Sequence, residues 1–291
     1  MTWLLLAIAT AFFESIKDIF SKKSLHDIDS LAVAFFLMFF TTVFLLPVLF
    51  VIPIPEIGDR FWVALLASGI INGIAWSLFM KAIQISDLSK AIPLTGLTPA
   101  FLLISSPILV GEFPNETGIF GIFLIILGTY ILNLGKAAIA RNFFTPFLAL
   151  SRDRGSKLAL CVALIWSLSG NIDKIGLQNS SPLFWITCDS ALVSLLLLPF
   201  VLLRLKKIKR QLQKNWVSLM AMGLFNALTI SCQMIALSLT LIVYVISIKR
   251  TSTILSVLWG SLIFREKGLQ ERLLGTTIMV LGVCAIAFSN T

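Results

Sequence analysis

The sequence has few charged residues and a single histidine among 291 residues. Charged side chains make up 13% of the chain and hydrophobic ones 58%, with a mean hydropathy of +0.97. A soluble domain of this length could not bury so large an apolar share in one core. Because unpaired backbone groups cannot face hydrocarbon, the long apolar runs predict membrane-spanning helices.

Catalytic and metal-binding patterns are also missing. The sequence contains no nucleophile elbow, phosphate-binding loop or cluster of histidine and cysteine. Its four cysteines lie inside apolar runs without metal-ligand spacing, so we expect small packed residues rather than disulfides or a zinc site. They are Cys161, Cys188, Cys232 and Cys284. We therefore expect no cofactor, no metal and no enzymatic activity.

The positive charge lies in particular places. The formal net charge is +9, but lysine and arginine occur mainly in short connections between apolar runs. In such positions basic residues set the orientation of membrane helices. We therefore expect lipid, and not nucleic acid, as the surrounding partner.

Apolar windows separated by turn and charge signals predict an all-α, polytopic membrane protein with ten transmembrane helices. The longest connection, 135–156, divides them into a first five-helix repeat at 1–134 and a second at 157–291. The expected spans are residues 3–21, 31–52, 60–82, 88–110, 117–134, 157–176, 183–203, 215–237, 240–263 and 270–288.

An internal repeat supports this division. Shifting the sequence by 154 residues superposes 62–132 on 216–286 without a gap. Since five crossings per unit is an odd number, the second unit enters the membrane inverted relative to the first, as in many secondary transporters. Matching pairs include Trp62 and Trp216, Asn72 and Asn226, Glu112 and Glu266, Gly121 and Gly275, and Gly128 and Gly282.

The distribution of basic residues predicts the orientation. The connection at 204–210 carries five basic residues, Arg204, Lys206, Lys207, Lys209 and Arg210, whereas its counterpart at 55–60 is nearly neutral. Lysine and arginine gather in the odd-numbered connections, which the positive-inside rule places in the cytoplasm, with both termini outside. We expect a multi-pass protein of the cell membrane, plasma or inner.

Two stretches resemble a known family. Residues 91–99, running to Glu112, and residues 243–252, followed by 265–267, resemble the fourth helix of each half in EamA-like members of the drug/metabolite transporter superfamily. The resemblance covers nearly the whole chain. It implies a ten-helix carrier made of two inverted repeats, with a central cavity and an alternating-access mechanism.

We expect a secondary transporter of a small metabolite such as an amino acid, with H⁺ or Na⁺ as a possible coupling ion. An alternative is an exchanger of phosphorylated or other anionic solutes, such as a sugar phosphate or nucleotide sugar. A non-transporting membrane receptor or scaffold is a more remote alternative.

The strongest site candidates are Lys249 and Arg250, roughly 15 Å from the membrane edge at 1.5 Å per helical residue. Burying each charge there costs about 2.5 to 3.5 kcal/mol unless a carboxylate, a wet cavity or an anionic substrate compensates. A Lys-Arg pair in this helix also resembles the phosphate-binding pair of sugar-phosphate carriers. The alternative is a salt bridge to Glu14, Asp18 or Asp189.

The same three acids are candidates for ion coupling. Glu14 and Asp18 share a helix face with Lys17, which could simply neutralise one of them. Asp189 has no basic neighbour in its own helix. A buried carboxylate is suited to carrying a proton or another cation.

Four further residues are candidates for the cavity wall. Asn72 and Asn226 occupy equivalent positions in the two halves, and could bind substrate or join helices. Trp76 and Trp166 are too deep for the interfacial aromatic belt and either line the cavity or pack.

Proline and glycine residues in the expected helices suggest a gate and close helix contacts. Pro93 and Pro99 loosen the fourth expected helix, which suggests a gate. The glycine pairs spaced seven residues apart at 121/128 and 275/282 place small residues on one face of each helix, which predicts close helix contacts there.

Overall fold

The structure consists entirely of helices and connections wherever it is described. It is a computed structural model that describes residues 1–85, 94–141, 154–255 and 269–289, with the backbone alone over 132–141, 205–207 and 269–273. Within these ranges the chain forms ten α-helices of at least 8 residues and one 3-10 helix. The all-helical prediction is therefore confirmed.

The first half contributes five α-helices and the 3-10 helix. These are α1 (Thr2–Asp27), α2 (Ser30–Leu45), η1 (Leu46–Phe50), α3 (Phe61–Ile85), α5 (Thr98–Leu109) and α6 (Glu116–Arg141). The second half contributes α8 (Arg154–Gln178), α9 (Pro182–Leu202), α10 (Leu205–Leu239), α11 (Ile242–Lys249) and α13 (Leu269–Ser289). The connection expected at 135–156 is shorter than predicted, because α6 reaches Arg141 and α8 begins at Arg154.

Two spans expected to be continuous are interrupted. In the second half, α11 ends at Lys249, Arg250 and Thr251 form a turn, and residues 252–255 are helical again. The hydroxyls of Thr251 and Thr253 donate to the carbonyls of Ile248 and Arg250 at 2.7 and 2.8 Å. Side-chain bonds of this kind compete with the regular helical pattern.

The first half has a matching interruption. Residues 94–95 are helical, Gly96 and Leu97 form a turn, and α5 then begins at Thr98. Pro99 lies in the first turn of α5, where its missing N–H has no helical partner to lose. The turn therefore separates two helical pieces, and Pro99 starts the second piece rather than bending a continuous helix.

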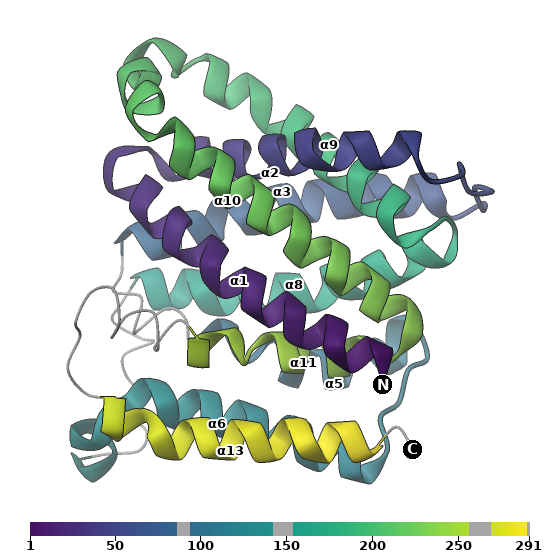
Figure 1. Ribbon diagram of the computed structural model, residues 1–291, viewed down its shortest axis with the longest axis vertical. Helices are drawn as coiled ribbons and strands as arrows, with labels where there is room; N and C mark the ends of the chain where they lie inside the picture. The colour runs from purple at the N-terminus through teal and green to yellow at the C-terminus, as the bar shows by residue number, and fades with distance from the viewer. Residues whose placement is uncertain (86–93, 142–153, 256–268, 290–291) are drawn as a thin grey trace.

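The helices of the two halves interlock. α6 packs against α13 at one edge, and α2, α3 and α9 lie at the other, while α1 and α10 cross side by side between them (Figure 1). α3 packs on α8 and α9, α2 packs on α9 and α10, and α5 contacts α8 and α11. Most helix contacts therefore join one half of the chain to the other.

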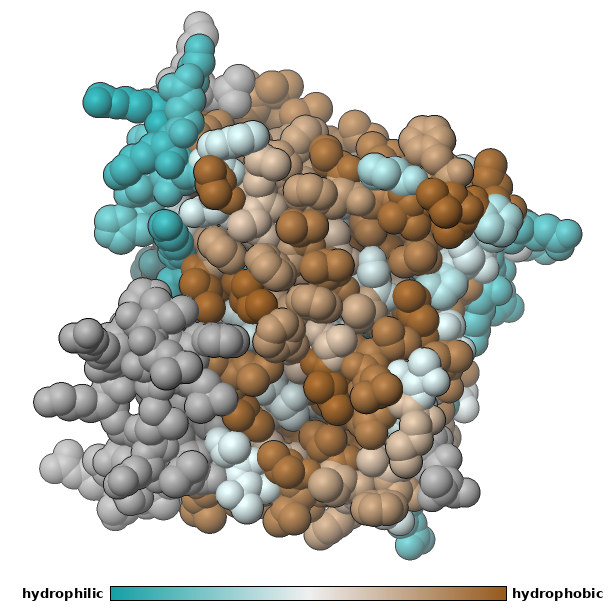
Figure 2. Space-filling model, viewed as in Figure 1, coloured by the Kyte–Doolittle hydropathy of each residue, from teal (hydrophilic) through white to brown (hydrophobic). Residues whose placement is uncertain are grey.

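The surface is apolar and the interior is partly polar. Along α3, Leu66, Ile70 and Ile74 are more than half exposed, whereas Ser68 and Asn72 are buried. Figure 2 shows a broad hydrophobic band across the face in view, with hydrophilic side chains at its ends. This distribution fits lipid around the middle of the molecule.

Five of the described helical segments are long and apolar enough to cross a membrane, by length and composition. They are Ser30–Phe50, Phe61–Ile85, Arg154–Gln178, Pro182–Leu202 and Ile208–Leu239, and shorter apolar helices accompany them. The cysteines are unpaired, but Cys161 and Cys284 are exposed on the outer surface rather than packed inside as expected. A thiol is apolar enough to face lipid.

Candidate functional site

A small cavity lies where the two halves meet. Its volume is about 70 Å³, which is room for a few water molecules. Helices α2, α3, α8, α9 and α10 contribute to its wall, as do the regions of both helix interruptions. The polar lining comprises Asn72, Thr98, Ser169, Asp173, Asp189, Gln233, Lys249 and Arg250.

Lys249 and Arg250 line this cavity at the interruption after α11. The Lys249 ammonium donates to Gln233 at 2.9 Å and lies 3.6 Å from a carboxylate oxygen of Glu14. The Arg250 guanidinium donates to Thr98 at 2.8 Å, which joins the two interrupted regions. The salt-bridge alternative thus holds for Lys249, whereas no carboxylate among the described residues pairs with Arg250 within 4.0 Å.

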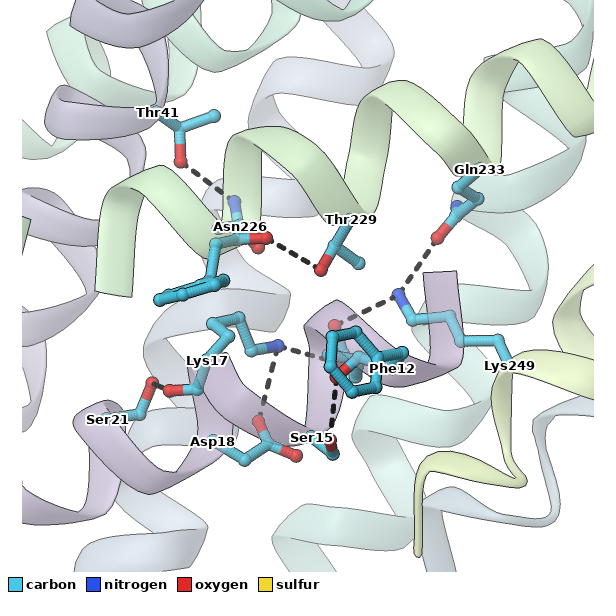
Figure 3. A network of polar contacts seen from close by, with 12 residues as sticks. Phe12, Ser15, Lys17, Asp18, Ser21, Thr41, Asn226, Thr229, Gln233 and Lys249 are labelled. Carbon is cyan, nitrogen blue, oxygen red and sulfur yellow. Dashed lines mark hydrogen bonds and ion pairs between the residues drawn. The ribbon is translucent and has the colours of Figure 1, made fainter. Parts of the chain in front are cut away.

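The acidic residues of α1 are engaged by Lys17. Its ammonium lies 2.8 Å from Glu14 and 3.3 Å from Asp18, and its side chain is fully buried. Figure 3 shows Lys17 and Lys249 extending toward the same region from α1 and α11, with Gln233 of α10 beside Lys249. Neither Glu14 nor Asp18 lines the cavity, but Glu14 is linked to it through its contact with Lys249.

The two deep tryptophans pack together on the cavity wall. The rings of Trp76 and Trp166 are 5.4 Å apart, centroid to centroid. The Lys17 ammonium lies 5.0 Å from the Trp76 ring and the Arg250 guanidinium 5.5 Å from the Trp166 ring. Both alternatives for these residues, cavity lining and packing, thus describe the same arrangement, with a cation–π contact on each ring.

Asn72 joins three helices at the cavity. Its amide donates to Ser68 at 3.0 Å and to Asp189 at 3.3 Å, and its oxygen accepts from Ser169 at 2.7 Å. Asp189 is 3% exposed, and its Oδ1 has no hydrogen-bond partner among the described residues. The isolated acid predicted in the seventh span is thus buried and faces the cavity.

Asp173 of α8 is a cavity residue that the sequence reasoning missed. It is 6% exposed and accepts from the Ser68 hydroxyl at 3.1 Å and from the Trp185 indole at 3.2 Å. The sequence places Lys174 next to it. In the structure Lys174 points elsewhere, and Asp173 lies with Asp189 instead.

Two candidates lie apart from the cavity. Asn226 is buried and donates to Thr41 of α2 at 2.9 Å, but it is not part of the cavity wall. It therefore joins helices in this structure. Pro93 lies outside the described residues, and Pro99 lies in the first turn of α5, one residue from the cavity residue Thr98.

A second buried ion pair, which the sequence did not predict, lies near the ends of several helices. The Lys174 ammonium is 2.8 Å from Glu112 and donates to the carbonyls of Leu237 and Thr240 at 2.6 and 2.8 Å. The other Glu112 oxygen accepts from the backbone of Ile242 at 2.8 Å. This cluster joins the segment between α5 and α6 to α8 and to the α10–α11 connection.

Comparisons with known proteins agree with this architecture. The sequence matches the family described as "EamA-like transporter family" over residues 1–134 and 153–288. A relative from Sinorhizobium sp, named "Uncharacterized transporter in cobO 3'region", is 25% identical over 138 residues, which cover 45% of this chain and 96% of the relative. A solved crystal structure superposes with a TM-score of 0.68 at 13% identity, covering 98% of this chain and 96% of that one, and thus shows a shared fold.

Proposed function

Because the chain belongs to the EamA-like transporter family, we propose that it carries a small solute across the membrane by alternating access through the cavity at Lys249 and Arg250. The proposed cargo is a small metabolite such as an amino acid, and the proposed location is the plasma or inner membrane of the cell. The protein's own residues bind the cargo, since the mechanism requires no cofactor.

We also propose that the two halves are inverted repeats of five transmembrane helices. The packing supports this, because exchanging the halves turns the α1–α10 contact into the α8–α3 contact and maps α2–α9 and α6–α13 onto themselves. The shift of 154 residues likewise carries the turn at Gly96 and Leu97 onto the turn at Arg250 and Thr251. The Sinorhizobium relative, about half as long as this chain, fits a five-helix unit.

The observation that carries the substrate site is the unpaired guanidinium of Arg250. Its Nε is buried and has no hydrogen-bond partner among the described residues, and the side chain lines the cavity. Burying a cation without a carboxylate is costly, so an anionic group on the substrate would compensate. Asn72, Trp76 and Trp166 would form the rest of the binding site. Asn226, which lies outside the cavity wall, would stabilise it by joining α10 to Thr41 of α2.

The contacts of Lys249 favour a cargo with one negative group over a phosphorylated one. Glu14 already lies 3.6 Å from Lys249, which leaves Arg250 as the cation free to bind an anion. A phosphate carries about two charges and is best held by several cations. An exchanger of phosphorylated or other anionic solutes remains the second candidate, and it would require Lys249 to leave Glu14.

The coupling ion, H⁺ or Na⁺, would bind to a buried acid. Glu14 and Asp18 are both within ion-pair distance of Lys17, whereas Asp189 has no such partner among the described residues. Asp189 is therefore the candidate that the contacts favour.

The gate would lie at the interrupted helix near Pro93 and Pro99, because a turn between two helical pieces can change its backbone angles more easily than a continuous helix.

The test is solute flux in proteoliposomes. A thermal-shift screen with amino acids, dicarboxylates and sugar phosphates selects the probe, because a ligand that binds the folded protein raises its melting temperature. We expect saturable uptake of an amino acid, and a loss of uptake of at least tenfold in Arg250→Gln without a lower melting temperature.

A matched control is Arg154→Gln, which removes an exposed arginine at the start of α8. This variant should transport normally. Full uptake by Arg250→Gln would remove Arg250 from the site, and saturable binding without any flux would favour a receptor over a carrier.

A further inference from the structure

Three charged residues on the cavity wall have no ion-pair partner within 4.0 Å among the described residues: Asp173, Asp189 and Arg250. The other charged residues on or next to the wall pair among themselves, Lys17 with Glu14 and Asp18, and Lys249 with Glu14. A buried carboxylate without an ion-pair partner is costly, so a positive species beside Asp173 and Asp189 would stabilise them.

Asp173 and Asp189 are the two acids on the cavity wall. Both line the cavity and both are more than nine-tenths buried. Ser68 and Asn72 link them, since Ser68 donates to Asp173 at 3.1 Å while Asn72 donates to Ser68 at 3.0 Å and to Asp189 at 3.3 Å. Two buried carboxylates linked through the same two side chains repel one another, and a proton on one of them would relieve this repulsion.

A second observation points to a bound positive species. The Oδ1 atom of Asp189 is buried, lacks a hydrogen-bond partner among the described residues and belongs to a side chain on the cavity wall. An acceptor left unpaired in this way destabilises the fold. A proton on either carboxyl removes one of the two negative charges of the pair without any change in the surrounding helices.

The pair is surrounded by hydrogen-bond donors rather than by the oxygen ligands that a metal cation needs. A hydroxyl and an indole N–H point at Asp173, and an amide N–H points at Asp189. A sodium ion would need several oxygen ligands in place of these donors. No group of three acidic, histidine or cysteine residues that could hold a metal exists in the described part of the chain.

Among the described residues, few other titratable groups face the pair. Lys249 and Arg250 face it across the cavity, and the Cys188 thiol precedes Asp189 on α9. The contributions of α2, α3, α5 and α10 to the cavity wall are neutral: Met38, Asn72, Trp76, Thr98, Ile230, Gln233 and Met234. Glu14 acts on Lys249, and Asp18 is a quarter exposed and beside Lys17, so solvent and Lys17 compensate its charge.

We propose that Asp173 and Asp189 share one exchangeable proton, and that this pair is the proton-binding site of the carrier. Loading the site forms one O–H bond on a carboxylate, and release breaks that bond and returns a proton to water. The purpose of the site rests on the proposed transport function, whereas the presence of the proton does not.

The experiment is an infrared pH titration of the purified full-length protein, which reports the C=O absorption of a protonated carboxyl group directly. We expect the absorption of one protonated carboxyl at neutral pH, which disappears in alkaline buffer. Asp173→Asn and Asp189→Asn should each abolish it, because the remaining acid then ionises. Asp59→Asn, in the connection before α3, and Asp18→Asn are the controls and should retain it.

Three results would overturn the proposal: no protonated-carboxyl absorption in the unaltered protein at neutral pH, its loss in Asp18→Asn, or its retention in both Asp173→Asn and Asp189→Asn. The absorption of the unaltered protein needs no variant to fold. Because the titration requires no cargo, a protein that keeps this absorption but shows no solute flux would contradict the transport function and leave the proton site standing.

Discussion

Glu14 compensates two buried ammonium groups at once, those of Lys17 at 2.8 Å and Lys249 at 3.6 Å. Replacing Glu14 by Gln leaves both cations with a weaker partner, whereas Lys249→Gln leaves Glu14 still paired with Lys17. We expect Glu14→Gln to destabilise the protein by about 3 to 5 kcal/mol, the usual effect of breaking a buried pair. Lys249→Gln should cost much less.

The measurement is the melting temperature of the detergent-solubilised protein, with Glu56→Gln, an exposed residue before α3, as the control. The double variant Glu14→Gln with Lys249→Gln should recover part of the loss, which reveals the coupling between the two sites. Equal melting temperatures for Glu14→Gln and the unaltered protein would contradict the buried-pair interpretation.

The sequence predicted some cavity residues and missed others for a physical reason. Lys249 and Asp189 were recognisable because a charge deep in an apolar run needs compensation whatever its neighbours are. Asp173 was not, because its partner Ser68 lies 105 residues away in the chain. A single sequence contains no signal for such a contact.

Among the helices, α6 and α13 make a close contact at the two glycine pairs that are spaced seven residues apart. A Cβ on Gly121 would lie 2.8 Å from the carbonyl oxygen of Gly282, and one on Gly128 would lie 2.7 Å from that of Gly275. These neighbours are backbone atoms, which cannot move aside as a flexible side chain can. The predicted close contact is therefore confirmed.

Gly121→Ala should accordingly destabilise the protein by about 1 to 3 kcal/mol, the usual effect of overpacking. Gly73→Ala on α3 is the matched control, because nothing lies within 4 Å of a Cβ there. Alanine favours a helix over glycine by about 0.5 to 1 kcal/mol, so the control should melt at the same or a higher temperature. A stabilising Gly121→Ala would show that the two helices are farther apart.

Lys174 joins helix ends that are distant in the sequence. Removing its ammonium by Lys174→Met leaves Glu112 buried without its cation and two carbonyls, of Leu237 and Thr240, without their donor. We expect a loss of about 3 to 5 kcal/mol. Adding Glu112→Gln should restore part of it, since the charge is gone and an amide oxygen can still accept from Ile242. Melting temperatures of the two single variants and the double variant test this, and strict additivity would contradict the pairing.

The interruptions of the two spans could not be predicted from apolar windows alone. A hydropathy window reports only how apolar a segment is. Ile248 and Ile254, on either side of the turn, are as apolar as residues of a continuous helix. The turn depends on which carbonyls the Thr251 and Thr253 hydroxyls bind, and those bonds compete closely with helical ones. The sequence therefore predicts the position of the element better than its continuity.

At the scale of the whole molecule, the all-helical character followed from hydropathy, and the division into two repeats is a prediction from the internal repeat. These are properties of long segments, so errors at single residues average out. The lateral packing of the halves against each other did not follow. It depends on the shapes of helix faces, and apolar faces toward lipid and toward other helices have similar composition.

The orientation in the membrane is a final prediction. Two contacts in the structure indicate which connections lie at the same end of the molecule. Arg204 after α9 lies 2.8 Å from Asp29 before α2, so the first and seventh connections lie at the same end of the molecule. The Gly58 backbone donates to the carbonyl of Asn179 at 2.9 Å, so the second and sixth connections also lie together. In these two contacts an odd-numbered connection meets an odd one and an even-numbered connection meets an even one, as an alternating topology requires.

Since the basic cluster at 204–214 lies on the odd side, we expect that side in the cytoplasm. In a background without native cysteines, Asp59→Cys should react with a membrane-impermeant maleimide in intact cells, and Gln213→Cys should react only after permeabilisation. The opposite labelling pattern would reverse the orientation while leaving the arrangement of helices unchanged. Labelling of both positions in intact cells would contradict the alternation itself, because the two residues would then lie on one side of the membrane.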